Sequence, residues 1–283
     1  MEGPLDWVLT ISTWFGSIKF YRNRLEIHTD GFSEIYVIET EDSIDDVANT
    51  HLHVAILMRN GQFGYRKTDR FGGKFEFSTT GISKNPKLLL ATSQSVYMVT
   101  EDSGESEIRK VIDDVVGILN QPTTIQFPWP VRIVDGDAGH DFVVLRDSGG
   151  NLFAMGTGTR GELGVGLIRR VDEPVHIEQL AGIRIAKVKC GGWHTVALTE
   201  HGDTYTWGWN RCGQLGKDKM ITEVYPVLID PETEFSAPEQ DVSDVNTTEN
   251  TTMITLKNNT EQVTESAVVV LGTDVSSEFQ IED

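Results

Sequence analysis

The sequence predicts an all-β fold of the propeller type, and three observations support that prediction. The chain repeats itself at a step of 52 residues, apolar and polar residues alternate within short segments of the repeat, and glycines separate those segments. A period near fifty residues is typical of propellers and solenoids, and alternation with period two is typical of strands. Glycine-rich turns between several short strands favour the propeller.

Three landmarks carry the repeat at the same offset. The matched segments are 150–156 with 202–208, Gly161-Glu162-Leu163-Gly164 with Gly213-Gln214-Leu215-Gly216, and Pro174-Val175 with Pro226-Val227. Further upstream, an offset of 53 places Gly139 on Gly192 and Asp141 on His194. The sequence therefore predicts at least two consecutive copies of one structural unit.

Each copy reads as several antiparallel strands. Alternating residues predict strands over 186–190, 194–199 and 205–209, with a short outer strand at 174–177. Gly202 lies between the second and third of these segments, where a tight hairpin needs a residue with positive φ. Several short antiparallel strands per repeat correspond to one propeller blade.

The second copy resembles the repeat signature of the regulator of chromosome condensation family. The residues that carry the resemblance are Gly191, Gly192, Trp193, His194, Trp207, Gly208, Trp209, Gly213, Gln214, Leu215 and Gly216. The resemblance is strong over residues 131–230 and implies a propeller of seven blades.

The first half of the chain fits the repeat less well. Residues 53–63 align with 194–204, so that Gly61 meets Gly202, and residues 93–99 are a candidate inner strand. We therefore expect propeller repeats over 1–230, degenerate over 1–130 and clear over 131–230. Seven blades at this period need roughly 360 residues, so in 283 residues the propeller is expected to be incomplete or to have fewer blades.

The last segment, 231–283, is predicted to be a flexible acidic tail rich in Asn and Thr. From Glu232 onward it holds 12 acidic residues and one basic residue, Lys257. Such a composition favours disorder, although two apolar runs, 253–256 and 267–271, are compatible with strands. The tail is either a solvated linker or a segment that attracts a basic partner such as a histone tail.

The signature residues are expected to be structural. Trp207 and Trp209 are predicted to share one face of a strand in the core. His194 is predicted to hydrogen-bond nearby backbone, Gln214 to satisfy loop backbone and Leu215 to fill the space between blades. A relative, the plant ultraviolet receptor, uses interface tryptophans with arginines, but no arginine adjoins Trp193 in the sequence.

Charge and composition exclude several classes of function. Lys and Arg number 24 against 43 Asp and Glu, a net charge of −19, so direct nucleic-acid binding is not expected. Neither a membrane span nor a signal peptide is indicated. His51 and His53 lie two apart, as a metal pair on a strand can, but no third ligand has suitable spacing. We expect no cofactor, no metal and no catalytic residues.

Residues 104–119 admit two structures. Ile108, Val111, Ile112, Val115 and Val116 fall at helical spacing with charged residues between them, which is compatible with an amphipathic helix. A strand pair reads almost as well, because valine and isoleucine favour sheets. The sequence does not choose between the two.

The function expected from these observations is that of a non-enzymatic propeller scaffold that binds a protein. The resemblance implies a JmjC-domain histone demethylase or hydroxylase as the partner, with roles in chromatin regulation and chromosome segregation, in the nucleus and also in the cytoplasm. The alternative is a guanine-nucleotide exchange factor for a small GTPase. No partner-binding residues are identified at this stage.

Overall fold

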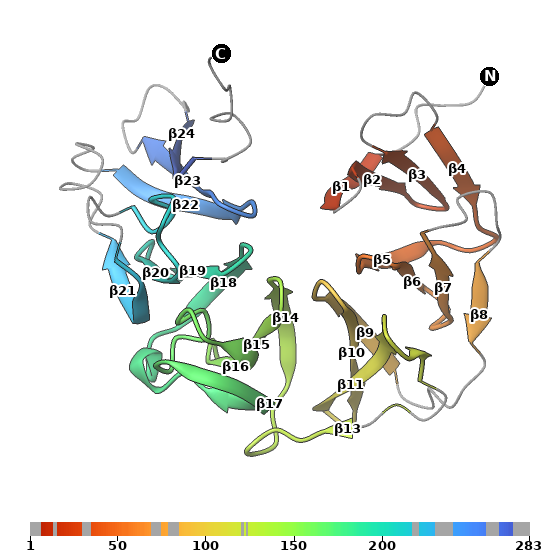
Figure 1. Cartoon of the computed structure of the whole chain (residues 1–283), viewed down its shortest axis with the longest axis horizontal. Coiled ribbons are helices and arrows are strands. Elements are labelled where there is room, and N and C mark those ends of the chain that lie inside the picture. The colour runs from red at the N-terminus through yellow and green to blue at the C-terminus, as the bar shows by residue number, and fades with distance from the viewer. Residues whose placement is uncertain are drawn as a thin grey trace, which may run out of the picture. The chain divides into compact units, whose positions relative to one another are not determined.

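The computed structural model is all-β and divides into two units, residues 1–125 and 126–283 (Figure 1). It describes residues 7–13, 16–29, 35–68, 75–78, 85–119, 122, 124–216, 221–229, 240–258 and 266–273. Within these ranges the only helical element is one 3-10 turn, η1 (Glu178–Leu180). None of the described helical structure is long and apolar enough to cross a membrane.

The N-terminal unit contains three antiparallel sheets. The first comprises β1 (Trp7–Thr13), β2 (Gly16–Tyr21), β3 (Arg24–Thr29) and β4 (Ile35–Glu39); the second comprises β5 (Ile44–Asn49), β6 (His53–Met58), β7 (Phe63–Lys67) and β8 (Glu76–Ser78). The third comprises β9 (Asn85–Ala91), β10 (Ser95–Asp102) and β11 (Glu105–Asp113), with the short strands β12 (Gly117–Ile118) and β13 (Thr124–Ile125) on β11.

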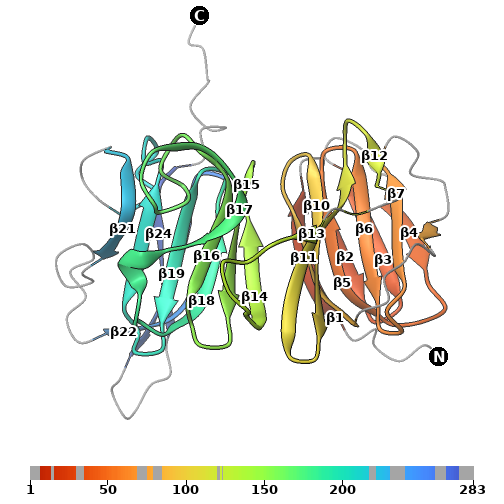
Figure 2. The same ribbon diagram turned by 90° about the horizontal axis from the view of Figure 1, so that it is seen from below.

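The C-terminal unit also contains three antiparallel sheets. They comprise β14 (Ile133–Ala138), β15 (Phe142–Asp147), β16 (Leu152–Gly158) and β17 (Ile168–His176); β18 (Ile185–Cys190), β19 (His194–Thr199), β20 (Thr204–Gly208) and β21 (Glu223–Ile229); and β22 (Gln240–Thr247), β23 (Thr252–Asn258) and β24 (Ser266–Leu271). The first strands of these sheets, β14, β18 and β22, lie side by side (Figure 1). Within each unit the strands run along a roughly common direction (Figure 2).

Apolar faces of successive sheets pack against one another within each unit. In the C-terminal unit, Leu152 and Ala154 of one sheet share a core with Ile185 and Val188 of the next. The third sheet extends this stack, because Val242 and Ile254 share a core with residues of β19. Sheets of few strands, each packed face to face on the next, are the architecture of propeller blades. The predicted fold class is confirmed.

The hairpin glycines lie where the sequence places them. Gly61 follows β6 and Gly202 follows β19, and both have positive φ, +83° and +92°. β6 and β19 begin at His53 and His194, so the predicted alignment of 53–63 with 194–204 matches the strands residue for residue. The outer strand predicted at 174–177 overlaps the end of β17.

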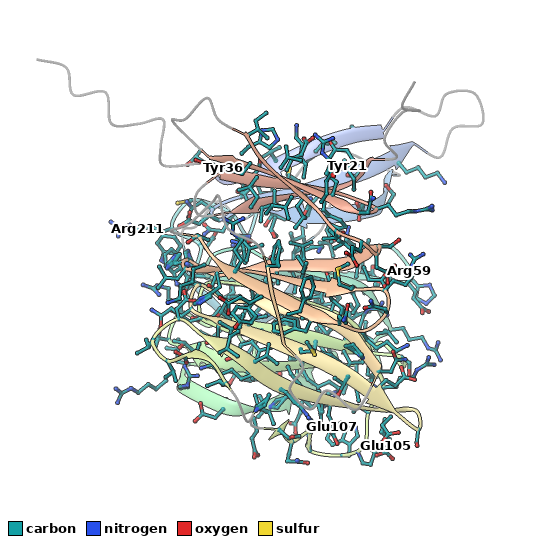
Figure 3. All side chains as sticks on the ribbon, turned by 90° about the vertical axis from the view of Figure 1, so that its right-hand side faces the viewer. Tyr21, Tyr36, Arg59, Glu105, Glu107 and Arg211 are labelled. Atoms are coloured by element: carbon teal, nitrogen blue, oxygen red, sulfur yellow. The ribbon has the colours of Figure 1, made fainter. Side chains whose placement is uncertain are left out.

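The two open questions of secondary structure both resolve as strands. Residues 105–113 form β11, in which Glu105 and Glu107 point outward (Figure 3) while Ser106 and Ile108 are buried. The segment predicted as a flexible tail contains β22, β23 and β24, and the last two include both of its apolar runs. The expectation of a flexible tail is therefore corrected for residues 240–258 and 266–271. The prediction from composition failed because Val242 and Ile254 pack in one core with Val196 of the preceding sheet.

Candidate functional site

Among the described residues, the same tight turn joins the first and second strands of five sheets. Its first residue donates a backbone N–H to the carbonyl of its fourth residue. The pairs are Thr50 to His53 (2.9 Å), Thr92 to Ser95 (2.9 Å), Gly139 to Phe142 (3.0 Å), Gly191 to His194 (2.9 Å) and Thr248 to Thr251 (3.0 Å). The end of each unit at which these turns lie is called its turn end below.

Hydrogen bonds also connect turns of neighbouring sheets. His51 N–H donates to the carbonyl of Ser93 (2.9 Å) in the N-terminal unit. In the C-terminal unit, His140 donates to Gly192 (3.0 Å) and Gly192 donates to Glu249 (2.9 Å). Each donor is the second residue of its turn, so the turn ends repeat from sheet to sheet.

These bonds correct the alignment of the two clear repeats. Gly139 matches Gly191 and Phe142 matches His194, both at a step of 52. The offset of 53, which placed Asp141 on His194, is wrong by one residue. In the sequence, Gly139 can be aligned with either of the adjacent glycines 191 and 192. The hydrogen bond between the first and fourth residues of the turn matches Gly139 with Gly191 alone.

Glycine at position 191 permits a close approach of the His194 ring. A Cβ at Gly191 would lie 2.0 Å from His194 Cε1 and 2.6 Å from the carbonyl oxygen of Thr248. Gly139 makes the matching approach to the ring of Phe142, at 2.0 Å. Since real Cβ atoms are not found at such distances, these glycines serve packing between sheets.

His194 joins its own sheet to the next one. Its side chain is fully buried, and Nε2 lies 3.0 Å from the hydroxyl of Thr252 at the start of β23. Burial lowers the pKa of His194 to about 4, partly opposed by a hydrogen bond with the backbone of Thr251. A neutral buried imidazole with a hydroxyl partner stabilises the contact between the two sheets.

Trp207 connects the β18–β21 sheet to the preceding sheet, β14–β17. Its Nε1 donates to the carbonyl of Glu162 (3.0 Å), which also accepts from the hydroxyl of Thr195 (3.0 Å). A Cβ at Gly164 would lie 2.8 Å from Nε1 of Trp207, so glycine at this position allows the 161–164 loop to pack closely on the indole. The Glu162 side chain is itself buried, and desolvation raises the pKa of its carboxyl.

The later copy of this loop repeats the arrangement on the third sheet. A Cβ at Gly216 would lie 2.8 Å from Leu271 Cδ1, where Gly164 meets Trp207 in the earlier copy. Gln214 is buried and its Oε1 accepts from the backbone N–H of Cys212 (2.9 Å). Leu215 is fully buried. The glycine-leucine-glycine loops therefore link consecutive sheets.

Trp193 and Trp209 lie outside the core, at the turn end of the C-terminal unit. β20 ends at Gly208, and a backbone bond from Trp209 N–H to the Trp193 carbonyl (2.9 Å) directs Trp209 toward the turn. Both indoles are half-buried and meet edge to face at 5.4 Å between centroids. The prediction that Trp209 shares the core with Trp207 is wrong, because the strand stops between them.

An arginine and a histidine complete this group of rings. The Arg160 guanidinium lies 4.5 Å from the centroid of Trp193, and the ring of His140 stacks on Trp193 at 4.2 Å. His140 Nε2 is 3.2 Å from a carboxylate oxygen of Glu249. We call His140, Arg160, Trp193, Trp209 and Glu249 the aromatic–arginine cluster. Arg160 is exposed, so the cluster presents a cation on an aromatic platform.

Sequence reasoning missed Arg160 and His140. It found no arginine next to Trp193, yet the two are brought together across two repeats, 33 positions apart in the chain. The alignment of the repeats could have pointed to both residues. Arg160 precedes the loop that packs on Trp207, and His140 lies in the turn of the sheet that precedes the sheet of Trp193.

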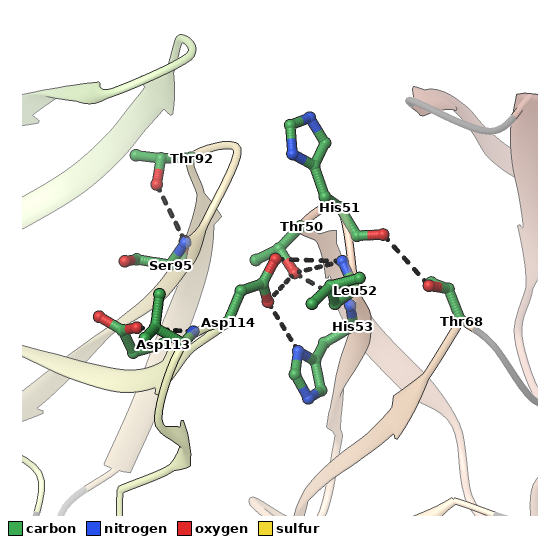
Figure 4. A network of polar contacts seen from close by, with 10 residues as sticks. Thr50, His51, Leu52, His53, Thr68, Thr92, Ser95, Asp113 and Asp114 are labelled. Atoms are coloured by element: carbon green, nitrogen blue, oxygen red, sulfur yellow. Dashed lines mark hydrogen bonds and ion pairs between the residues drawn. The ribbon is translucent and has the colours of Figure 1, made fainter.

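The turn end of the N-terminal unit is built on a carboxylate. Asp114 accepts from the Thr50 hydroxyl (2.6 Å) and from Leu52 N–H (3.1 Å), and lies 2.7 Å from His53 Nδ1 (Figure 4). The next two residues, Val115 and Val116, are 85% and 71% exposed. His53 is buried and His51 is exposed, so the two do not form a metal pair. Among the described residues no group of three or more suitable side chains could hold a metal ion.

Comparison with known proteins is consistent with this geometry. Residues 149–198 and 201–253 match the model of the regulator of chromosome condensation (RCC1) repeat, and a second model of that repeat matches 185–214. The mouse "RCC1 domain-containing protein 1" is 45% identical over 85 residues, which cover 30% of this chain and 22% of that protein. The chain thus spans about a fifth of the length of this curated relative.

Two solved structures share the fold. Human WBSCR16 superposes with a TM-score of 0.69 at 15% identity, covering 90% of this chain and 76% of that one. Prp20p from Saccharomyces cerevisiae superposes with a TM-score of 0.62 at 14% identity, covering 81% and 64%, and its structure is described together with its binding to Gsp1p and histones. The chain therefore shares the propeller-type fold of these structures, and its residues 149–198 and 201–253 are similar to the regulator of chromosome condensation (RCC1) repeat.

Proposed function

We propose that this chain is a non-enzymatic scaffold that binds a protein partner through the aromatic–arginine cluster. The observation that carries the proposal is the exposed Arg160 on the half-buried Trp193 and Trp209. Tryptophan and arginine are the side chains most enriched at the centres of protein interfaces. The cluster rests on turns linked by backbone hydrogen bonds, so its geometry is set before a partner arrives.

The partner proposed is a JmjC-domain histone demethylase or hydroxylase, with the chain acting in chromatin regulation and chromosome segregation in the nucleus. The proposal rests on the similarity of residues 131–230 to small members of the RCC1 repeat family. It agrees with the acidic composition of the chain, which disfavours direct binding to nucleic acid phosphates.

The test is a titration of the chain against a purified JmjC-domain oxygenase by calorimetry. Trp193→Ala and Arg160→Glu are expected to weaken binding by about tenfold or more, the effect of losing one interface hot spot. Arg169→Glu is the matched control, since Arg169 is an exposed arginine on β17 outside the cluster. No binding by the unaltered chain, or full binding by both cluster variants, would overturn the proposal.

The second candidate function is guanine-nucleotide exchange on a small GTPase, supported by the fold shared with Prp20p. It is separated from the first by a different assay. The chain is added in substoichiometric amount to a panel of small GTPases loaded with labelled GDP. Release of GDP would establish exchange activity, and no release from any of them would favour the scaffold function.

A further inference from the structure

Arg160 is held at two points and keeps its side-chain donors for another molecule. Its backbone N–H donates to the buried carboxylate of Glu162 (2.6 Å), and its guanidinium lies 4.5 Å from the centroid of Trp193. A cation–π contact of this kind needs none of the five N–H donors of the guanidinium. The group is therefore placed for a planar oxyanion such as a carboxylate before one arrives.

The matching glycine loop of the next repeat presents a second arginine. In that loop Gln214 Oε1 accepts from the N–H of Cys212 (2.9 Å), which repeats the anchor of the Arg160 loop. Arg211 directly precedes Cys212, is exposed and extends away from the ribbon (Figure 3). The two arginines thus come from equivalent loops of neighbouring sheets, and neighbouring sheets stack about 10 Å apart.

Both guanidinium groups are without an acidic partner in the described part of the chain. Other exposed arginines pair with a carboxylate, as Arg170 does with Asp172 (2.6 Å). Among the described residues, Arg160 and Arg211 form no ion pair of this kind. The two arginines therefore present unused donors, although the chain carries a net charge of −19.

We propose that the partner bound by the aromatic–arginine cluster presents an acidic segment, in which two carboxylates about 10 Å apart pair with Arg160 and Arg211. An apolar side chain between the carboxylates packs on the half-buried indoles of Trp193 and Trp209. This inference rests on the function proposed above and deepens it, because it names the chemistry that the partner brings to the same site.

Two acidic side chains make this surface selective. Asp141 and Glu249 lie in turns at the same end of the unit, and Glu249 already lies 3.2 Å from His140 Nε2. A carboxylate of the partner is repelled by these groups unless a guanidinium is within ion-pair distance, so the spacing of the acidic residues decides which segments bind. A phosphoryl group offers the same kind of oxygen acceptor, and the experiment separates the two sources.

The probe is a blocked peptide of sequence Glu-Leu-Gly-Glu, whose two acidic residues are about 10 Å apart when extended. It is added to the full chain at low ionic strength, and NMR follows the arginine Nε–H and the indole N–H signals. We expect shifts at Arg160, Arg211, Trp193 and Trp209. A peptide with glutamine in place of both glutamates is expected to bind about tenfold more weakly. Peptides with phosphoserine or lysine at these positions are titrated in parallel.

Variants of the chain test the two arginines separately. Arg160→Gln and Arg211→Gln are each expected to weaken binding of the glutamate peptide about fivefold, the upper range for one exposed ion pair. Arg169→Gln is the matched control and is expected to bind as the unaltered chain does, because Arg169 is exposed on β17 outside the cluster.

The results separate this inference from the function on which it rests. The inference is overturned if the glutamate peptide shifts none of the four signals, if the glutamine peptide binds equally well, or if the phosphoserine or lysine peptide binds in its place. Each of these results leaves the scaffold function standing, since that function is judged by binding of the oxygenase to Trp193→Ala. Binding of the glutamate peptide without any binding of the oxygenase would support the acidic chemistry and reject the named partner.

Discussion

The sheets β5–β8 and β18–β21 build the same turn with different chemistry. In both, the fourth residue of the turn is a buried histidine that reaches a neighbouring sheet of the same unit. In β18–β21, glycine lets the His194 ring lie on the backbone, and the partner is the hydroxyl of Thr252. In β5–β8, threonine takes the place of glycine, and the carboxylate of Asp114 holds Thr50, Leu52 and His53.

The difference teaches that hydrogen-bond geometry is retained where the sequence signature is not. One turn is stabilised by close packing between neutral groups, the other by a carboxylate that satisfies three donors. The packed turn leaves room for large rings at the surface, which become the aromatic–arginine cluster. The carboxylate turn instead presents Leu52, 49% exposed, whose backbone N–H donates to Asp114.

Trp207→Ala is expected to produce the largest effect, because it removes a fully buried indole and its hydrogen bond to Glu162. Loss of a buried tryptophan costs about 3–5 kcal/mol. Chemical denaturation should show this loss, and hydrogen exchange should locate it in β19, β20 and the 161–164 loop. An unchanged denaturation midpoint would contradict the role of this indole between sheets.

The pH dependence of stability is the next largest effect. The pKa of His194 is about 4 in the folded chain, below its usual value of 6.5. The unfolded chain therefore binds more protons between these values, so stability is complete above pH 6.5 and falls as the pH approaches 4. The loss is on the order of 3 kcal/mol. The loss of stability on acidification should be smaller in His194→Gln and unchanged in His201→Gln, since His201 is exposed. The free energy of unfolding is measured against pH for both variants, and the same pH dependence in both would show that His194 is not its cause.

Asp114→Ala should destabilise the other unit. It removes the carboxylate partner of the Thr50 hydroxyl and the His53 ring, and leaves the Leu52 N–H only its longer bond to the Thr50 hydroxyl oxygen, at an expected cost of about 2–3 kcal/mol. Exchange should accelerate in β5 to β7 and remain unchanged in β18 to β21. Asp45→Ala removes an exposed partner of Arg59 and is expected to cost less than about 1 kcal/mol. Similar losses for both aspartates would mean that the network of Figure 4 contributes little.

Gly191→Ala sharpens the comparison between the two turns. The added methyl group meets the His194 ring and a backbone oxygen, and overpacking of this kind costs about 1–3 kcal/mol. The expected signature is faster exchange at the start of β19 and a rise in the pKa of His194 as its ring is displaced toward water, followed by NMR titration. A variant with unchanged stability and His194 pKa would show that the turn can relax.

The sequence predicted much of the fold from local pattern. Period-two alternation located β19 and β20, and the hairpin glycines aligned β6 with β19 even though the signature residues between them differ. Composition failed for β22 and β23, because apolar residues spaced among acids and threonines can still share one face of a sheet. The charge pattern of a segment does not show whether a neighbouring sheet packs on it, as the sheet of β19 packs on β22 and β23.

The candidate site was harder to predict, because its members come from different repeats. Arg160 directly precedes one glycine loop, Trp193 lies in the turn of the next sheet and Glu249 lies in the turn of the sheet after that. Each looks ordinary within its own repeat. Only the stacking of one sheet on the next brings a cation, two indoles and a carboxylate to one surface.

A comparison of Trp193→Ala with Trp207→Ala tests most directly whether the two tryptophans of one signature have different roles, one in recognition and one in the core. Thermal unfolding and calorimetric binding to a JmjC-domain oxygenase are measured for each variant. We expect that Trp193→Ala keeps the melting temperature and loses the partner, whereas Trp207→Ala lowers the melting temperature. If Trp193→Ala unfolds as readily as Trp207→Ala, or melts normally and binds normally, the division of the signature into a structural part and a recognition part is contradicted.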